Sequence, residues 1–128
     1  MPNAQQLLEW VSDPAFAEGF PSGDDADSAL DLRDDASNED PWLREHEAVQ
    51  ELLGERPVGP EIMTTIERLA EVAFVRTFEV SDQHHDLAAQ VSDDMQLLAE
   101  AAAVGYSSPA LTKLWDTYAK GTFPTTIG

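Results

Sequence analysis

Residues 60–104 read PEIMTTIERLAEVAFVRTFEVSDQHHDLAAQVSDDMQLLAEAAAV, and this stretch decides the predicted fold. Its mostly apolar residues recur at steps of three and four, which is the spacing of one face of an α-helix. The stripe consists of Ile62, Ile66, Leu69, Ala73, Thr77, Val80, His84, Leu87, Val91, Met95, Leu98 and Ala102. The pattern therefore predicts helix. A strand at 72–80, which the β-branched and aromatic residues there would favour, ranks last because the stripe passes through it.

The length of this stretch indicates two helices. A single helix from residue 60 to 104 would be roughly 65 Å long, whereas a compact domain of this size has a radius of gyration of roughly 14 Å. Ser81 is a residue type that caps helix N-termini, and Asp82 suits a first turn. We therefore expect a break near residues 80–82 and two antiparallel helices. The alternative is one long helix in a homodimer formed through residues 60–104.

Proline at the start of a segment and glycine after its end frame the other helices. Segments open at Asp13-Pro14, Asp40-Pro41, Gly59-Pro60 and Ser108-Pro109, and glycines stand at 19, 54 and 121. We predict a single all-α domain over residues 1–128, a small helical bundle of four main helices plus one short helix. The tail after Gly121 is expected to be extended and pinned by Phe123.

Residues 21–40 read PSGDDADSALDLRDDASNED and hold eight acidic residues against one base, Arg33. Such a high charge with few apolar residues is typical of solvated or disordered segments. We expect an acidic loop here, poorly ordered, with one short turn around Leu30.

Composition excludes several classes of protein. The 128 residues include 25 acidic and seven basic residues, for a net charge of -18, and no cysteine. The lack of cysteine excludes disulfide scaffolds, zinc–thiolate sites and cysteine nucleophiles. No apolar run is long enough to cross a bilayer, and the first residues lack the features of a signal peptide, so we expect a cytoplasmic protein. The charge disfavours direct binding to nucleic acid or to anionic membranes.

The sequence contains no recognisable catalytic or metal-binding motif. The adjacent His84 and His85 lack the spacing of three or four that a two-histidine helical metal site requires, and residues 25–36 depart from the calcium-loop pattern. We expect His46 and His84 to be partly buried and hydrogen-bonded, and His85 to be exposed. We therefore predict no enzyme, no cofactor and no metal, with a carboxylate–histidine metal-binding bundle as a remote alternative.

The negative charge favours a basic partner. We predict a non-enzymatic protein-binding domain that engages a basic protein, such as a nucleic-acid-binding protein. A sharper version is an inhibitor that mimics nucleic acid, of the anti-defence or immunity type. The candidate contact residues are acids of the predicted loop, a glutamate row with a spacing of four, and two phenylalanines: Asp24, Asp25, Asp27, Asp34, Asp35, Glu47, Glu51, Glu55, Phe16 and Phe20.

Each of these features also has a simpler interpretation. Glutamate rows are common on solvated helix faces, and phenylalanines are more often core residues than partner contacts. The acidity, with its scarce lysine, could instead be an adaptation to a halophile's cytoplasm. The concentration of acids in residues 1–40 favours a specific partner over that alternative, because a halophile spreads charge over its whole surface.

Overall fold

The computed structural model describes residues 2–127 and consists of helices joined by short connections. In chain order the elements are α1 (Ala4–Ser12), the 3-10 helix η1 (Pro14–Ala17), α2 (Gly23–Asp34), α3 (Ala36–Glu55), α4 (Pro60–Val80), α5 (His85–Val104) and α6 (Pro109–Ala119). This confirms the predicted all-α bundle, with six α-helices over the described residues instead of four main helices and a short one. None of the helices in residues 2–127 is both long and apolar enough to cross a membrane.

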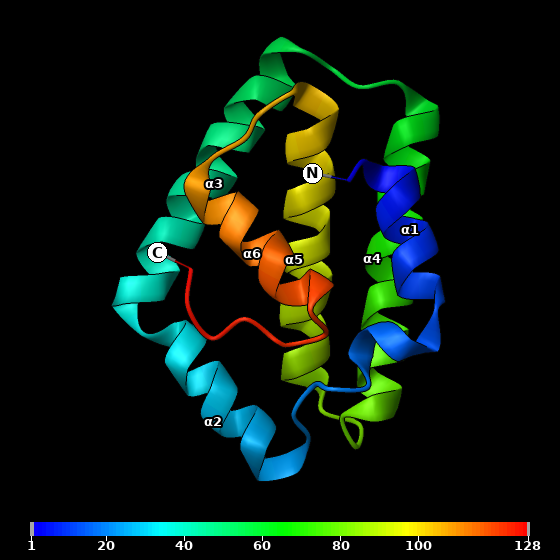
Figure 1. Cartoon of the computed structure of the whole chain (residues 1–128). Helices are drawn as coiled ribbons and strands as arrows, with labels where there is room; N and C mark the ends of the chain where they lie inside the picture. The colour runs from blue at the N-terminus through cyan, green and yellow to red at the C-terminus, as the bar shows by residue number, and fades with distance from the viewer. Residues whose placement is uncertain (1, 128) are drawn as a thin grey trace.

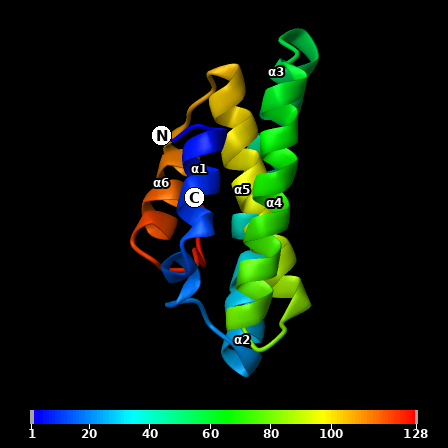
Figure 2. The same cartoon turned by 90° about the vertical axis from the view of Figure 1, so that its right-hand side faces the viewer.

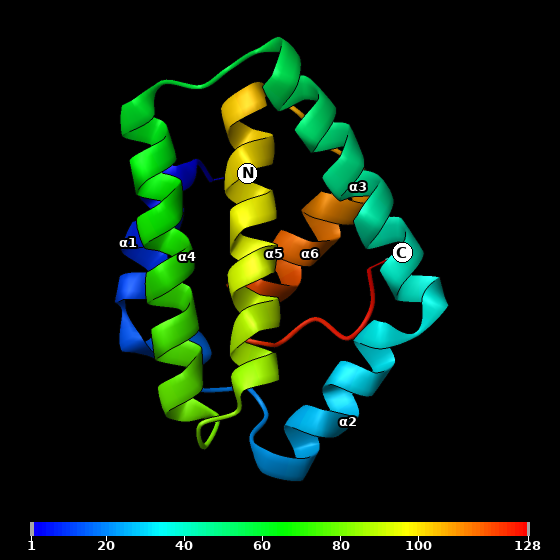
Figure 3. The ribbon, with the colours of Figure 1, turned by 180° about the vertical axis from the view of Figure 1, so that it is seen from behind.

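Helix α5 lies at the centre of the bundle (Figure 1). Helix α4 runs antiparallel beside it, and α1 packs against both. The side view places α1 and α6 on one side of α5 (Figure 2). Seen from behind, α4, α5 and α3 form the other layer, and α2 continues the line of α3 at an angle (Figure 3). This arrangement leaves α2 and α3 at the edge of the molecule.

The chain reverses between α4 and α5, as predicted, so the long-helix alternative is wrong. Asp82 and Gln83 make the turn with positive φ angles of 58° and 61°. The predicted N-cap at Ser81 is also wrong, because these two residues separate it from α5. The cap is His84, whose Nδ1 accepts a hydrogen bond from the Leu87 N–H at 3.1 Å. Homodimerisation through residues 60–104 stays a prediction.

The acidic loop predicted at residues 21–40 is wrong, because α2 and the start of α3 occupy it. One side of α2 is buried at helical spacing, through Ala26, Ala29, Leu30 and Arg33. Packing of such a face stabilises a helix that would not form alone. The acidic residues occupy the remaining, solvent-exposed side, so high charge and helical structure coexist in this segment.

Helix α3 begins at Ala36, not at Pro41 as predicted. The reason is that Asp35 caps it, with Oδ1 accepting a hydrogen bond from the Ser37 N–H at 2.9 Å. Pro41 lies inside α3. Because proline has no N–H, this position cannot donate a backbone hydrogen bond to the preceding turn. The predicted stop at Gly54 is wrong by one residue, since α3 ends at Glu55.

The C-terminal tail is fixed to the body, as predicted. Phe123 is 3% exposed and packs its ring against Phe20 and Tyr118, at centroid distances of 6.2 and 6.4 Å. From the end of α6 the tail crosses the bundle toward the junction of α2 and α3 (Figure 1). The last helix before it also begins as predicted, with Ser108 as the N-cap of α6.

Candidate protein-binding surface

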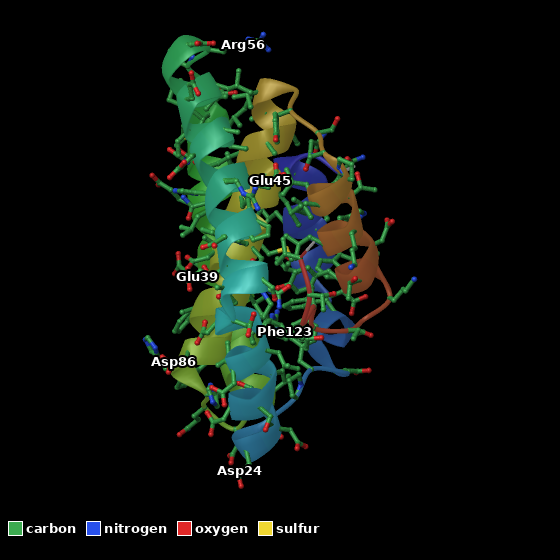
Figure 4. All side chains as sticks on the ribbon, turned by 90° about the vertical axis from the view of Figure 1, so that its left-hand side faces the viewer. Asp24, Glu39, Glu45, Arg56, Asp86 and Phe123 are labelled. Atoms are coloured by element: carbon green, nitrogen blue, oxygen red, sulfur yellow. The ribbon has the colours of Figure 1, made fainter. Side chains whose placement is uncertain are left out.

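Helices α2 and α3, residues 23–55, form a surface that we call the acidic arm. The arm carries 12 of the 25 acidic residues of the chain and two arginines, Arg33 and Arg44. In side view the two helices form one column along the molecule, which runs from Asp24 toward Arg56 (Figure 4). Arg33 is only 4% exposed, so Arg44 is the one arginine of the arm that reaches its surface.

All eight acidic residues predicted as partner contacts lie on the arm and are exposed. They occupy the first turns of α2 (Asp24, Asp25, Asp27), the junction of the helices (Asp34, Asp35) and the outer face of α3 (Glu47, Glu51, Glu55). Two of them also have structural roles. Asp27 pairs with His84 Nε2 at 2.6 Å, and hydrogen bonds from Ser37 hold the pKa of Asp35 below its ordinary value.

The two predicted phenylalanine contacts lie in the core. Phe16 and Phe20 are 4% and 7% exposed. Their rings pack edge-on against each other at 5.6 Å, and Phe16 also contacts Trp10 at 5.1 Å. They have little surface left for a partner, which agrees with the simpler core-packing interpretation.

A buried carboxylate holds the arm to the bundle. Asp94 of α5 has no exposed surface, and Arg33 of α2 binds both of its oxygens at 2.9 Å. Trp42 of α3 donates its indole N–H to Oδ1 at 2.9 Å, and Gln90 donates to the same oxygen at 3.1 Å. The Tyr118 hydroxyl of α6 donates to Oδ2. One carboxylate therefore joins α2, α3, α5 and α6.

The electrostatics of this network keep Arg33 charged and the Tyr118 hydroxyl protonated. Burial alone would lower the pKa of Arg33, but the charge and hydrogen bonds of Asp94 more than offset it, so the pKa of Arg33 lies above its ordinary value. Burial and the charge of Asp94 raise the pKa of Tyr118 well above 10.0, so the hydroxyl stays protonated and donates. A buried charge pair is tolerated only when its remaining polar atoms are satisfied in this way.

The C-terminal tail is tied to the same junction. Arg33 donates a third hydrogen bond to the Pro124 carbonyl at 3.1 Å and lies over the Phe123 ring, 5.5 Å from its centroid. Asn38, at the start of α3, donates to the Thr125 carbonyl and accepts a hydrogen bond from the Ile127 N–H at 2.9 Å. The tail thus fixes the position of the arm.

The prediction missed this network, although the sequence carries a signal for it. Arg33 is the one base among eight acids and stands three residues after Leu30, on the same helical face. Asp94 likewise stands three residues after Val91 on the buried stripe of α5. A basic residue on one apolar helix face and an acidic residue on another favour an internal ion pair over two solvated groups.

His84 and His85 lie as predicted, whereas His46 has the predicted partial burial but, among the described residues, stacks on an aromatic ring instead of forming the predicted hydrogen bond. His84 is partly buried and hydrogen-bonded to Asp27, and His85 is exposed. His46 is partly buried and stacks on Trp42, with 5.2 Å between ring centroids and 12° between planes. Over residues 2–127, no three histidine or carboxylate side chains converge into a set that could hold a metal ion.

A comparison with protein families assigns the chain. The family model described as Immunity protein PIM1 matches residues 6–125. The chain belongs to this family. The segment matched by the PIM1 model includes the whole acidic arm and every member of the Asp94 network. Membership of an immunity-protein family is compatible with the predicted non-enzymatic protein of the immunity type. No curated protein matches the chain.

Proposed function

We propose that this chain is an immunity protein that binds a toxin through the acidic arm and thereby blocks a basic surface of that toxin. Its membership of the PIM1 immunity-protein family supports the class of function. The observation that carries the choice of surface is the charge of the arm, which has 12 acidic residues and one exposed arginine, Arg44.

The negative charge of the chain is unevenly distributed between the acidic arm and the segment around α6. Arg33 is bound to Asp94, so it does not neutralise the outside of the arm. The segment 109–120 around α6, by contrast, contains Lys113 and Lys120 against a single acid, Asp116. A protein with such an uneven field orients a basic partner before contact and speeds its association. The arm is therefore the part of the molecule that a basic toxin would meet first.

The outer face of α3 supports a sharper form of the proposal, in which the arm imitates nucleic acid. Side chains four residues apart on a helix lie about 5–6 Å from one another. Glu47, Glu51 and Glu55 thus place three exposed carboxylates in a line along α3. A groove that binds nucleic acid recognises a line of negative charges through its lysines and arginines. The proposed target surface is such a groove on the toxin.

The test is the affinity of the chain for a candidate toxin domain. The test variant carries Glu47→Gln and Glu51→Gln. The control carries Glu67→Gln and Glu71→Gln, an exposed pair with the same spacing on α4. Exposed charge pairs contribute about 0.2–1 kcal/mol each, so the test variant should weaken binding about 2- to 30-fold. The control should bind like the unchanged chain.

Two further readouts complete the test. The affinity of the unchanged chain should fall steeply as NaCl rises from about 0.05 to 0.5 M, because salt screens exposed charges. Co-expression with the toxin should protect cell growth. Equal losses for the α3 and α4 variants would refute the arm as the binding surface, and absence of binding by the unchanged chain would refute the proposed function.

A further inference from the structure

A hollow of about 160 Å³ opens between the arm and α5. Its walls include Asp34 at the end of α2, Glu39, Trp42 and Leu43 of α3, and Asp93 of α5. A cavity of about 150 Å³ can accommodate a benzene molecule, so this hollow has room for the end of a large side chain. It lies directly beside the Asp94 network, whose Arg33 forms part of its wall.

The charge of the hollow is negative. Asp34, Glu39 and Asp93 are exposed carboxylates along its wall. The one basic group of the wall, Arg33, is already bound through both of its terminal nitrogens to Asp94. Three carboxylates therefore face a space whose only cation is neutralised by a fourth carboxylate.

Two apolar side chains, Trp42 and Leu43, also line the hollow. The Trp42 indole is fixed at one edge by its hydrogen bond to Asp94 and stacks with the His46 ring. Leu43, next to it in the sequence, is 42% exposed and also lines the hollow. An aromatic side chain that is already held in place loses little conformational entropy when a partner packs against it.

Asp93 lies beside the hollow and next to the negative charge of Asp94. Neighbouring atoms that remove it from water, and the adjacent charge of Asp94, raise the pKa of Asp93, while His46 opposes the rise. A cation that entered the hollow would lower the free energy of the ionised Asp93 carboxylate. The size of the hollow and its negative charge thus both favour the positively charged end of a large side chain.

We propose that the hollow receives an arginine side chain of the toxin. A planar guanidinium group packs against aromatic rings and binds carboxylates through two parallel hydrogen bonds, which a lysine ammonium group cannot do. Trp42 and Leu43 contact the flat face and the aliphatic stem, and Asp93 and Glu39 accept the N–H groups. The inference rests on the proposed function, because the arginine belongs to the toxin. It supplies a buried contact that the exposed glutamate row lacks.

The first test does not require the toxin. The ¹⁵N-labelled chain is titrated with arginine amide while the indole N–H signals are followed by NMR. The Trp42 signal should shift in a saturable manner, and lysine amide should shift it less. Asp93→Asn should weaken the response, whereas Glu71→Gln on α4 should leave it unchanged. No shift at Trp42, or an equal shift in Asp93→Asn, would overturn the proposed site.

The second test uses the toxin. Asp93→Asn combined with Glu39→Gln should weaken binding about 10- to 30-fold, the range expected for a central contact of an interface. Substituting the inserted toxin arginine with lysine should weaken binding by a similar factor. Combining this substitution with the Asp93→Asn and Glu39→Gln variant should cause little further loss of affinity. If the unchanged chain binds the toxin and this variant binds equally well, the hollow is not the arginine site, while the proposed function stands. If the unchanged chain does not bind, the proposed function fails and the arginine-amide titration still decides the hollow.

Discussion

The substitution Asp94→Asn tests how the arm is held to the bundle. It keeps the shape of the side chain but removes the charge and turns one of its two acceptor positions into a donor. Each oxygen of Asp94 accepts at least two hydrogen bonds, from Arg33 and Tyr118 on one side and from Arg33, Trp42 and Gln90 on the other. An amide group must therefore face donors with its own N–H in either orientation.

The cost follows from the burial of the pair. Asp94 is fully buried, and the Arg33 charge would lose its partner in a site that is 4% exposed. Removing one partner of a buried ion pair costs about 3–5 kcal/mol. A domain of this size has a total stability of about 5–15 kcal/mol, so the variant should remain folded but be much less stable. With an unfolding entropy of about 2.1 cal/mol/K per residue, its Tm should fall by about 11–19 °C.

The measurement is urea unfolding followed by circular dichroism, with Asp93→Asn as the control. Asp93 is the neighbouring residue and is exposed, so the same substitution there should change stability by no more than about 0.5 kcal/mol. A double-mutant cycle with Arg33→Met should give a coupling energy of about 1–3 kcal/mol between the two residues. A loss below about 1 kcal/mol for Asp94→Asn would refute the assignment of Asp94 as the group that holds the arm.

Three further predictions concern packing, pH and salt. Gly19→Ala should lower the unfolding free energy by about 1–3 kcal/mol, because its Cβ would stand 2.6 Å from the Gly121 carbonyl oxygen; Gly54→Ala, which meets open space in α3, should raise it by about 0.4–1 kcal/mol. Burial holds the pKa of Glu100 above its ordinary value, so its ionisation destabilises the fold as pH rises. Glu100→Gln should therefore have the higher Tm near pH 7, with a difference that closes below about pH 4. Finally, the chain should be folded in about 0.05 M KCl, with a Tm that rises gradually toward about 1 M as its net charge of -18 is screened; folding only at molar salt would instead support the halophile interpretation.

The parts of the fold that could be predicted from sequence are those in which apolar periodicity decides the structure. The stripe over residues 60–104 predicted both long helices, because steps of three and four leave one buried face, and the break between them followed from the length of the stretch. The details of the break could not be predicted in this way. Ser81 has the right chemistry for a cap, but the left-handed conformations of Asp82 and Gln83 moved the cap to His84.

Helix α2 was missed because its buried face is made of small residues and one arginine. Ala26 and Ala29 contribute little to a hydrophobic pattern, and the charge of the segment conceals Leu30. The candidate surface was predictable in part, since the acids of the arm are exposed as a solvated face requires. The hollow beside it was not, because it brings together residues 34–43 and 93, which are far apart in the sequence.

Asp35 is the whole connection between α2 and α3, since α2 ends at Asp34 and α3 begins at Ala36. One residue added in helical conformation to the first turn of α3 would turn the rest of α3 by about 100° relative to α2 and displace it by about 1.5 Å. Asn38 would then lose its hydrogen bonds to the C-terminal tail, and Trp42 would lose its hydrogen bond to Asp94. The row of Glu47, Glu51 and Glu55 would face a different direction. We therefore expect insertions and deletions at this joint to destabilise the fold more than substitutions on the exposed sides of both helices do. Under the proposed function, recognition of a different toxin would thus arise by exchanging side chains on a scaffold of fixed length.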